Sequence, residues 1–515
     1  MHWFGKMGST LVVAVGCGLL FLSSVAVAQD SLTIDVNVDT GQAAIAEQDF
    51  LSVIANENES VRRQMLETLI AKEGIENAWG LFEPTLEMSY DREYENEQND
   101  ADEAATRDGR STYKREENVA SIGVNSLLPT GTNIELIHSF HDPSTSLQTS
   151  EQYGRQKRIK MGVAVTQPLL KNCGVDANLT QVRIAERQHK ISEYRLDRAR
   201  LIAVFRAGQA YYDMQLAQTR YAIEGKLLNL SKEVARIVNK QVDEGKVPTS
   251  AIFRSESSLA RRKARFHTAE RVLRRSSSSI RQMLVGTSLA TNSEVRVSGT
   301  LPELNMDGVL VEKSPEQLLT SRPDYLAAKL EYELEKDRVN YADNQTLLDV
   351  KLKGEYGQTG LGRNWGTAYD ALGEGYEYWT VGASVSVPLG GGISDESMLR
   401  AAQKRAKRTK LVLNNLAGVI TDEIDTSRRE VCSAFDEARG LFNVVRFQRK
   451  VLDDGDKLFK NGRIDRSELI VQEQEYLEAR LILAEKLVEF KKAVLVLLLS
   501  EGRLLEDCQI EVERS

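Results

Sequence analysis

Proline is scarce in this sequence: there are 9 among 515 residues, with none between Pro168 and Pro248 and none after Pro388. Because proline breaks the interior of a helix, these two stretches can form long uninterrupted helices. Cysteine is also rare, at 4 residues, which excludes a disulfide-stabilised scaffold. The chain has a net charge of −8, so it lacks the excess of basic residues that binding to nucleic-acid phosphates requires.

The sequence also lacks the motifs of the common enzyme classes, since it contains no CxxC, GxSxG or P-loop pattern. Its five histidines show no metal-ligand spacing. Gly390-Gly391-Gly392 lacks the Lys-Ser/Thr ending of a phosphate-binding loop, so we interpret it as a bend between a strand and a helix. The sequence predicts no enzyme, no cofactor and no metal site.

Long apolar runs are missing except at the amino terminus. Residues 1–28 have the pattern of a secretory signal peptide, with a basic residue at Lys6, an apolar stretch over 11–25 and a small-residue cleavage site ending at Ala28. A transmembrane anchor is the alternative, but it needs about 20 apolar residues, and glycines and serines interrupt this stretch. We expect the mature chain to be either soluble outside the cytoplasm or in a membrane as β-strands.

The sequence contains an internal repeat. Arg183 and Arg400 begin similar segments, Gly245 and Gly462 lie in similar turns, and each pair is 217 residues apart. An unchanged offset means that no insertion separates the start of a helix from its turn in either copy. A tube of packed helices requires this preserved register.

We divide the chain into a first repeat at 29–300 and a second repeat at 301–515, each with a long helical hairpin. The helices are predicted at 176–243 with 250–285, and at 393–460 with 467–499. At 1.5 Å per residue the first helix of each hairpin would be about 100 Å long. Apolar residues recur at helical spacings in the last of these segments, which we interpret as helix packing.

Segments that alternate apolar and polar residues precede the hairpins. The predicted strands are 84–94, 118–127, 132–140 and 158–168 in the first repeat, and 347–357 and 379–388 in the second. The alternation is typical of a membrane barrel with apolar residues outside, and a soluble antiparallel sandwich gives the same pattern. The long helices favour the barrel, because a compact sandwich does not use them.

Two further features of the predicted strands concern their pairing and their aromatic residues. The sequence leaves open whether the pair 118–127 and 132–140 joins the other strands or folds elsewhere. Aromatic residues flank the loop between the last two strands, where a barrel would have its aromatic girdle. These residues are Trp365, Tyr376, Tyr378 and Trp379.

Glycines mark the turn of each helical hairpin. Gly245 and Gly462 suit the left-handed position that ends a helix. Ser250 and Ser467 are predicted to cap the returning helices. We expect the residues around the two turns to be exposed; they are Lys246, Val247, Arg463 and Ile464.

The mature chain keeps three cysteines, so at least one is free in an oxidising compartment. They are Cys173, Cys432 and Cys508. The last two can pair if the carboxy-terminal tail folds back, and the sequence leaves this pairing open.

The ordered motifs of the chain resemble those of the TolC family of outer-membrane efflux proteins. The matching segments are Phe82-Glu83-Pro84, Gln167-Pro168-Leu169-Leu170, Arg322-Pro323-Asp324 and Val387-Pro388-Leu389-Gly390, together with the two glycine turns. The resemblance implies an α+β fold: a homotrimer with a shared antiparallel outer-membrane β-barrel and a long periplasmic α-helical barrel made of duplicated helical hairpins. It implies a passive exit duct for tripartite efflux or type I secretion.

The partners implied by the resemblance are a periplasmic adaptor, an inner-membrane transporter and outer-membrane lipid. The adaptor would dock on the helix tips around Gly245, Lys246, Val247 and Ser250, and around Gly462, Arg463, Ile464 and Ser467. We keep one alternative from another class, a structural envelope-spanning coiled coil or adaptor without a pore. The sequence does not identify the exported substrate.

The resemblance also implies a ring of acidic residues at the tip of the second hairpin. Glu468 occupies the first matching position, and the second is Val471, which departs from the family pattern. Asp465 is a candidate substitute for the missing acid. Phe459 occupies the aromatic gate position and has no hydroxyl to donate a hydrogen bond. Three Glu468 carboxylates near one axis would favour cations.

Overall fold

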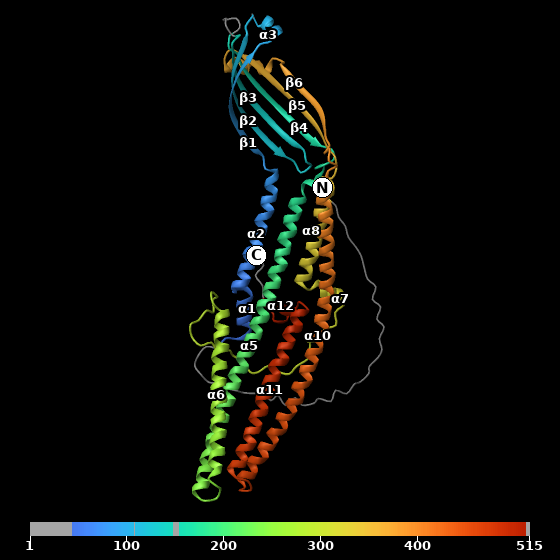
Figure 1. Ribbon diagram of the computed structural model, residues 1–515. Coiled ribbons are helices and arrows are strands. Elements are labelled where there is room, and N and C mark those ends of the chain that lie inside the picture. The colour runs from blue at the N-terminus through green and yellow to red at the C-terminus, as the bar shows by residue number, and fades with distance from the viewer. Residues whose placement is uncertain (1–43, 108, 148–153, 511–515) are drawn as a thin grey trace, which may run out of the picture.

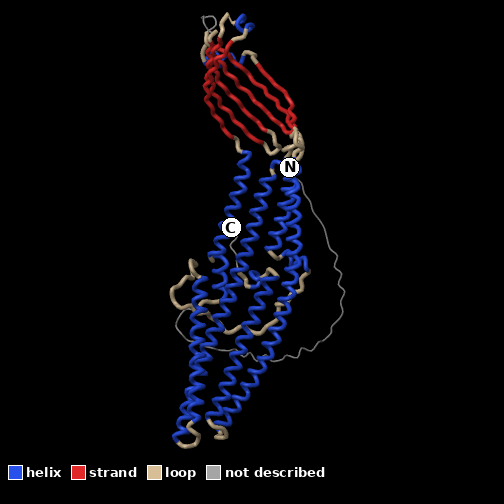
Figure 2. The backbone as a smooth tube through the Cα atoms, viewed as in Figure 1, coloured by secondary structure: helices blue, strands red, loops and turns tan. Residues whose placement is uncertain are grey.

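The computed structural model describes residues 44–107, 109–147 and 154–510, so the predicted signal peptide lies outside the described residues. The molecule is elongated, with a β-sheet at one end and helices extending away from it (Figures 1 and 2). The strands are β1 (Thr85–Gln98), β2 (Thr112–Leu127), β3 (Asn133–Thr145), β4 (Lys157–Pro168), β5 (Asp349–Gly362) and β6 (Glu377–Ser386).

Seven helices carry the elongated part of the described chain. They are α1 (Glu47–Glu57), α2 (Glu59–Trp79), α5 (Thr180–Asp243), α6 (Ser250–Met283), α8 (Pro323–Gln345), α10 (Ile393–Lys460) and α11 (Arg466–Ser500). The remaining helical elements are short: η1 (Gly80–Phe82), α3 (Ala101–Thr106), α4 (Val175–Asn178), α7 (Pro315–Thr320), α9 (Trp365–Asp370), η3 (Ala371–Gly373) and α12 (Leu504–Asp507). The two longest helices, α5 and α10, contain no proline.

The six strands form one sheet in chain order, β1-β2-β3-β4-β5-β6, and every neighbouring pair is antiparallel. The strand pair that the sequence left unplaced is β2 and β3, and it lies inside this sheet. Each long helical hairpin therefore starts at the same end of the sheet, because an even number of strands precedes it.

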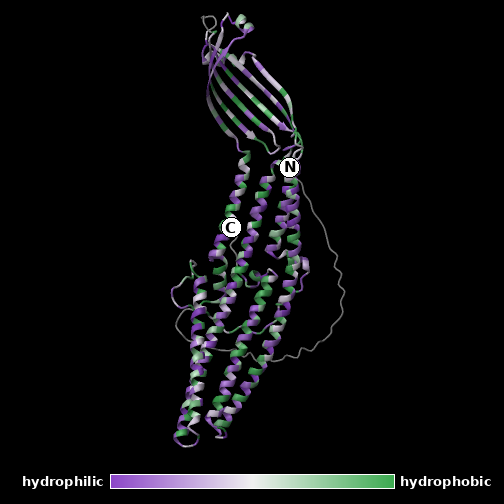
Figure 3. Cartoon of the chain, viewed as in Figure 1, coloured by the Kyte–Doolittle hydropathy of each residue, from purple (hydrophilic) through white to green (hydrophobic). Residues whose placement is uncertain are grey.

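One face of the sheet is apolar from edge to edge. The row of directly paired residues that starts at β1 is Leu86, Val124, Leu136, Val163, Tyr356 and Trp379. Five of these are among the exposed large hydrophobic residues of the chain, and Trp379 is 72% exposed. A row on the opposite face is polar and reads Ser89, Ser121, Ser139, Lys160 and Thr359. Figure 3 shows this alternation along the strands.

Glycines let other groups approach the sheet on both faces. On the polar face Tyr378 lies over Gly357 and Gly162, where an added Cβ at Gly162 would be 2.5 Å from the tyrosine hydroxyl. The prediction that Tyr378 belongs to an outer aromatic rim is therefore wrong. On the apolar face α9 packs over Gly360, where a Cβ would collide with the carbonyl of Ala368. Trp365 does lie on the apolar face, where it packs edge to face against Phe140, and its position agrees with the predicted aromatic rim.

Four helices lie side by side at each level of the elongated part. Near the sheet their order is α2-α5-α8-α10, and farther away it is α6-α5-α11-α10. The main core lies where α1, α5 and α11 meet. Its fully buried side chains include Phe50, Tyr211 and Phe490. The lateral edges of the helical layer are α2 and α6 on one side and α10 on the other.

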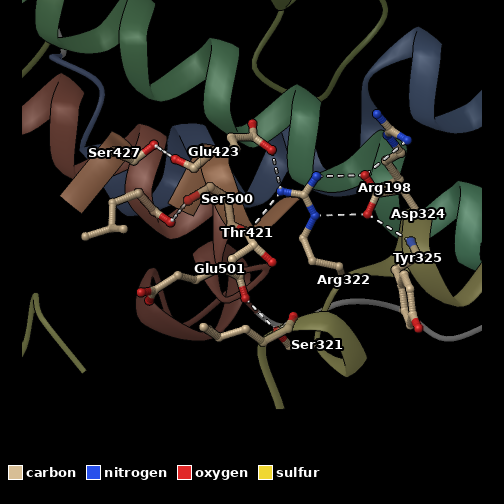
Figure 4. Close-up of polar contacts among 12 residues, drawn as sticks. Arg198, Ser321, Arg322, Asp324, Tyr325, Thr421, Glu423, Ser427, Ser500 and Glu501 are labelled. Carbon is tan, nitrogen blue, oxygen red and sulfur yellow. Dashed lines mark hydrogen bonds and ion pairs between the residues drawn. The ribbon is translucent and has the colours of Figure 1, made fainter. Parts of the chain in front are cut away.

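An ion-pair network joins the helices midway along this layer (Figure 4). Arg322, at the start of α8, donates to both carboxylate oxygens of Asp324 at 2.9 and 2.7 Å and to the carbonyl of Ser500 at the end of α11 at 2.9 Å. It also donates to Glu423 of α10 at 3.2 Å, and Arg198 of α5 lies 3.3 Å from Asp324. The Arg322-Pro323-Asp324 motif therefore fixes the junction of α5, α8, α10 and α11.

The charges of this junction are matched inside the protein. Burial by itself raises the pKa of Asp324, but hydrogen bonds from Arg322 and its positive charge outweigh burial and hold that pKa below the ordinary aspartate value. The stabilisation by this pair is therefore complete above the ordinary pKa and is lost as the pH falls through the lower pKa of the folded protein. Glu501 is fully buried beside Arg428 and Arg503, at 2.8 and 3.0 Å.

Among the described residues, Cys173, Cys432 and Cys508 are free, so the pairing of Cys432 with Cys508 is not present.

Within the described ranges, no helix is both long enough and apolar enough to span a membrane.

We predict that Arg322→Met destabilises the protein by about 3–5 kcal/mol, because it leaves the buried Asp324 carboxylate without its main partner. The matched control is Arg195→Met, which removes an exposed pair with Glu331 and should cost no more than about 1 kcal/mol. Urea unfolding followed by far-ultraviolet circular dichroism measures both variants at pH 7. Equal stabilities of the two variants would contradict the structural role of the junction.

Candidate functional site: the paired helix tips

The two hairpin turns lie together at the end of the molecule farthest from the sheet (Figure 1). In the first turn Gly245 has a φ of +68°, and the Lys246 amide donates to the carbonyl of Gln241 at 2.8 Å. In the second turn Gly462 has a φ of +70°, and the Arg463 amide donates to the carbonyl of Leu458 at 2.9 Å. Both helices thus end in the glycine-dependent motif predicted from the sequence.

The helix caps differ from the prediction. Asp465 caps α11, since its carboxylate accepts a hydrogen bond from the Glu468 amide at 2.8 Å. Ser467 lies one residue inside the helix, so its predicted role as the cap is wrong. In the first turn Thr249 precedes α6 without a side-chain cap, and Ser250 is the first helical residue. Each serine is a suitable capping residue type, but the chain enters the helix earlier than either one.

The two candidate acids therefore have different environments. Asp465 is committed to the helix terminus by its hydrogen bond to the Glu468 amide. Glu468 is exposed in the first turn of α11, where the helix dipole favours a negative charge. Val471 is half exposed one turn further along, and Phe459, the last residue but one of α10, is 38% exposed. Both acids are exposed at this turn, and Asp465 also carries the hydrogen bond that caps the helix.

The residues predicted to contact a partner divide into exposed and half-buried groups. Arg463 is exposed, and Lys246 is exposed beside Glu244, with its ammonium group 2.8 Å from that carboxylate. Val247 and Ile464 are half buried. Ile464 packs against the apolar cluster between α10 and α11, so it stabilises the turn from inside.

An ion pair that the sequence did not reveal ties the second tip to the first hairpin. Arg466 of α11 donates to both oxygens of Glu233 of α5, at 2.9 and 3.1 Å. The hydrogen bond from Arg466 lowers the pKa of Glu233 below its ordinary value. The two residues are 233 positions apart, so no local pattern could have paired them. This contact sets the lateral position of the second tip.

Solved structures share this architecture. The chain aligns with the CmeC outer membrane channel of Campylobacter jejuni at a TM-score of 0.62 and 13% identity, over 89% of this chain and 86% of that one. A membrane protein from Pseudomonas aeruginosa aligns at a TM-score of 0.62 and 14% identity, over 89% and 91%. The open MtrE outer membrane channel of Neisseria gonorrhoeae aligns at 0.60 and 14%, over 89% of both chains.

No protein-family model and no curated protein matches the sequence. The structural alignments cover nearly the whole of both chains, so the likeness includes the sheet and the helices together. The chain therefore has the fold of these channels, and the fold-level resemblance that the sequence motifs predicted is confirmed.

We predict that Asp465→Ala frays the first turn of α11, because it removes the side-chain acceptor of the Glu468 amide. The expected loss is about 1 kcal/mol, which corresponds to a fivefold faster hydrogen exchange in this turn. Ser467→Ala is the control and should leave the exchange rate unchanged. A larger effect of the serine variant would show that the cap is at Ser467 after all.

Proposed function

We propose that this chain is one subunit of a homotrimeric channel in the outer membrane, with its helices in the periplasm, and that it serves as the exit duct of a tripartite efflux or type I secretion system. Residues 1–28 would direct export and be removed. The fold it shares with solved outer membrane channels supports this proposal. The family assignment and the location rest on this likeness and on the surfaces described next.

The observation that carries the proposal is the exposed apolar face of the sheet. It extends over all six strands, and Met88 and Trp379 on its two edge strands are 69% and 72% exposed. A soluble monomer rarely exposes so large a continuous apolar patch. Lipid on this face and water on the opposite, polar face would satisfy both surfaces.

The lateral edges of the helical layer fit a ring of identical subunits. On α6 small exposed residues recur at helical spacing: Ser257, Ala260 and Ala264. On α10 large exposed residues recur in the same way: Val444, Phe447 and Val451, at 45%, 56% and 47% exposure. Large side chains of one copy can enter the space beside small ones of the next, which is how helices pack closely.

The two stripes also lie at one height above the tips. Ala260 is 10 residues from the start of α6 at Ser250, or about 15 Å, and Val451 is 9 residues from the end of α10 at Lys460, or about 14 Å. Three copies joined head to tail through these edges would close a tube of twelve helices. The two repeats support the same plan, since α2 packs on α5 as α8 packs on α10.

The energy and the cargo would come from partners. An inner-membrane transporter would drive export, and a periplasmic adaptor would dock on the exposed parts of the tips around Lys246 and Arg463. Glu468 would contribute the acidic constriction. A second candidate function, a non-pore coiled-coil adaptor, accounts for the helices, but it gives no role to the exposed apolar sheet.

We predict that cysteines at Ala260 and Val451 form a disulfide between neighbouring subunits. In a background with the native cysteines replaced by serine, the double variant should run as a covalent trimer on a non-reducing gel. Cysteines at Ala260 and Leu411 are the matched control, because Leu411 is at least as exposed as Val451 but lies 49 residues from the end of α10. A dimer as the largest product, or equal cross-linking of the control, would contradict the proposed ring.

We predict that Glu468→Ala raises the single-channel conductance or weakens block by multivalent cations, because it removes three carboxylates from the entrance. Planar-bilayer recording of the reconstituted protein measures both quantities. Glu256→Ala removes an exposed acid from α6 near the other tip and is the control. Unchanged conductance and unchanged block would exclude Glu468 from the constriction.

A further inference from the structure

The sheet has two edges that no strand covers within the described chain. β1 pairs with β2, and β6 pairs with β5, which leaves the outer backbone groups of both strands open. A strand edge cannot face the interior of a membrane, because each unpaired amide or carbonyl costs several kcal/mol there. Something must therefore cover both edges over the membrane thickness.

Closure within one chain does not fit the polar face. Six strands spaced about 4.8 Å apart and tilted by about 40° would make a barrel about 12 Å wide between backbones. Such a barrel has no room for the side chains of Lys160 and Tyr378, which point to the polar face. In Figure 1, β1 and β6 also lie at opposite sides of the sheet. A second copy of this chain is the remaining partner that can present a matching edge.

We infer that β1 of one copy pairs antiparallel with β6 of the next, and that Leu86 lies opposite Val385 of that neighbour, so that three copies of six strands close an 18-stranded barrel. This inference rests on the proposed trimer. The pairing places Leu86, Met88 and Tyr90 opposite Val385, Ala383 and Val381. A shift by one residue would set the apolar face of one copy against the polar face of the next.

The registers inside the chain test this pairing independently. The row of paired residues that starts at Leu86 ends at Trp379, which is six residues away from Val385 along β6. Following paired residues across one copy therefore displaces the row by six residues along the strands. Across three copies, once around the barrel, the displacement is 18 residues. A stagger of 18 over 18 strands gives a tilt of about 35°, within the range of closed barrels.

Other registers that keep the faces matched fit less well. Placing Leu86 opposite Ala383 would reduce the tilt to about 25°, below the range of closed barrels. Placing it opposite Val387 would give a tilt of about 43°, which is within the range, but it would use a residue beyond the end of β6 at Ser386. The geometry therefore selects the pairing of Leu86 with Val385.

The width of this barrel has a consequence for the cargo. Eighteen strands tilted by about 35° give about 33 Å between opposite backbones. Twelve helices spaced about 9 Å apart give a tube about 34 Å wide. The strands thus continue the helical tube without narrowing, and a solute that passes the tips meets no second constriction in the barrel wall. Size selection would then fall to the tips and not to the barrel wall.

Threefold-averaged electron cryomicroscopy of the trimer tests the strand count, and cysteine pairs test the register. We expect 18 strands, and a disulfide between subunits for Leu86→Cys with Val385→Cys but not for Leu86→Cys with Val381→Cys. Twelve strands with β2 and β3 outside the wall, or preferential cross-linking of the second pair, would overturn the inference. A chain that is not trimeric would instead overturn the proposed function.

A shortened chain tests the width. Removing residues 112–145 deletes β2 and β3 and keeps β1 and β4 antiparallel, which leaves twelve strands in a trimer, with a barrel about 22 Å wide. In polymer-exclusion measurements from the outer side, the widest polyethylene glycol that enters the full-length channel should be at least about 1.5 times as wide as the widest that enters the shortened one, because side chains of equal depth line both walls. Equal size cut-offs for the two chains would contradict the inference. If the shortened chain does not fold, the number of strands seen in the full-length trimer decides the question.

Discussion

The organisation of this protein depends on one constraint: a single chain cannot cover all of its own sheet. The apolar face of the six strands needs lipid, and the edges at β1 and β6 need other strands. The helices follow the same order, because α2 leads into β1 and β6 leads into α10. The open edges of the sheet and of the helical layer therefore fall on the same two sides, so one head-to-tail contact between copies can close both.

Rigidity is distributed unevenly along the molecule. At the junction midway along the layer, Arg322 and Glu501 are buried in ion pairs, and the junction joins four helices. The tips are held by apolar packing around Ile464 and Ile470 and by the exposed pair of Arg466 with Glu233. Exposed pairs contribute little stability, so the tips have weaker polar contacts than the junction. This difference suits the proposal that the tips form the entrance.

Local patterns predicted most of the fold. The absence of proline indicated α5 and α10, and α10 spans the predicted residues 393–460. Period-two alternation indicated all six strands, but not that β2 and β3 enter the sheet, because alternation shows burial and not pairing. Contacts between distant residues were missed, such as Arg466 with Glu233. The α11 cap was misplaced because Asp465 and Ser467 are both capping residue types and lie two positions apart.

The central claim is that identical copies of this chain enclose a water-filled path across a membrane. Single-channel recording of the purified full-length protein in planar bilayers tests it most directly. We expect discrete conductance steps of uniform size from a preparation in which the trimer is verified by cross-linking. A folded trimer that inserts into the bilayer and leaves it electrically sealed, even in the Glu468→Ala variant, would contradict the account.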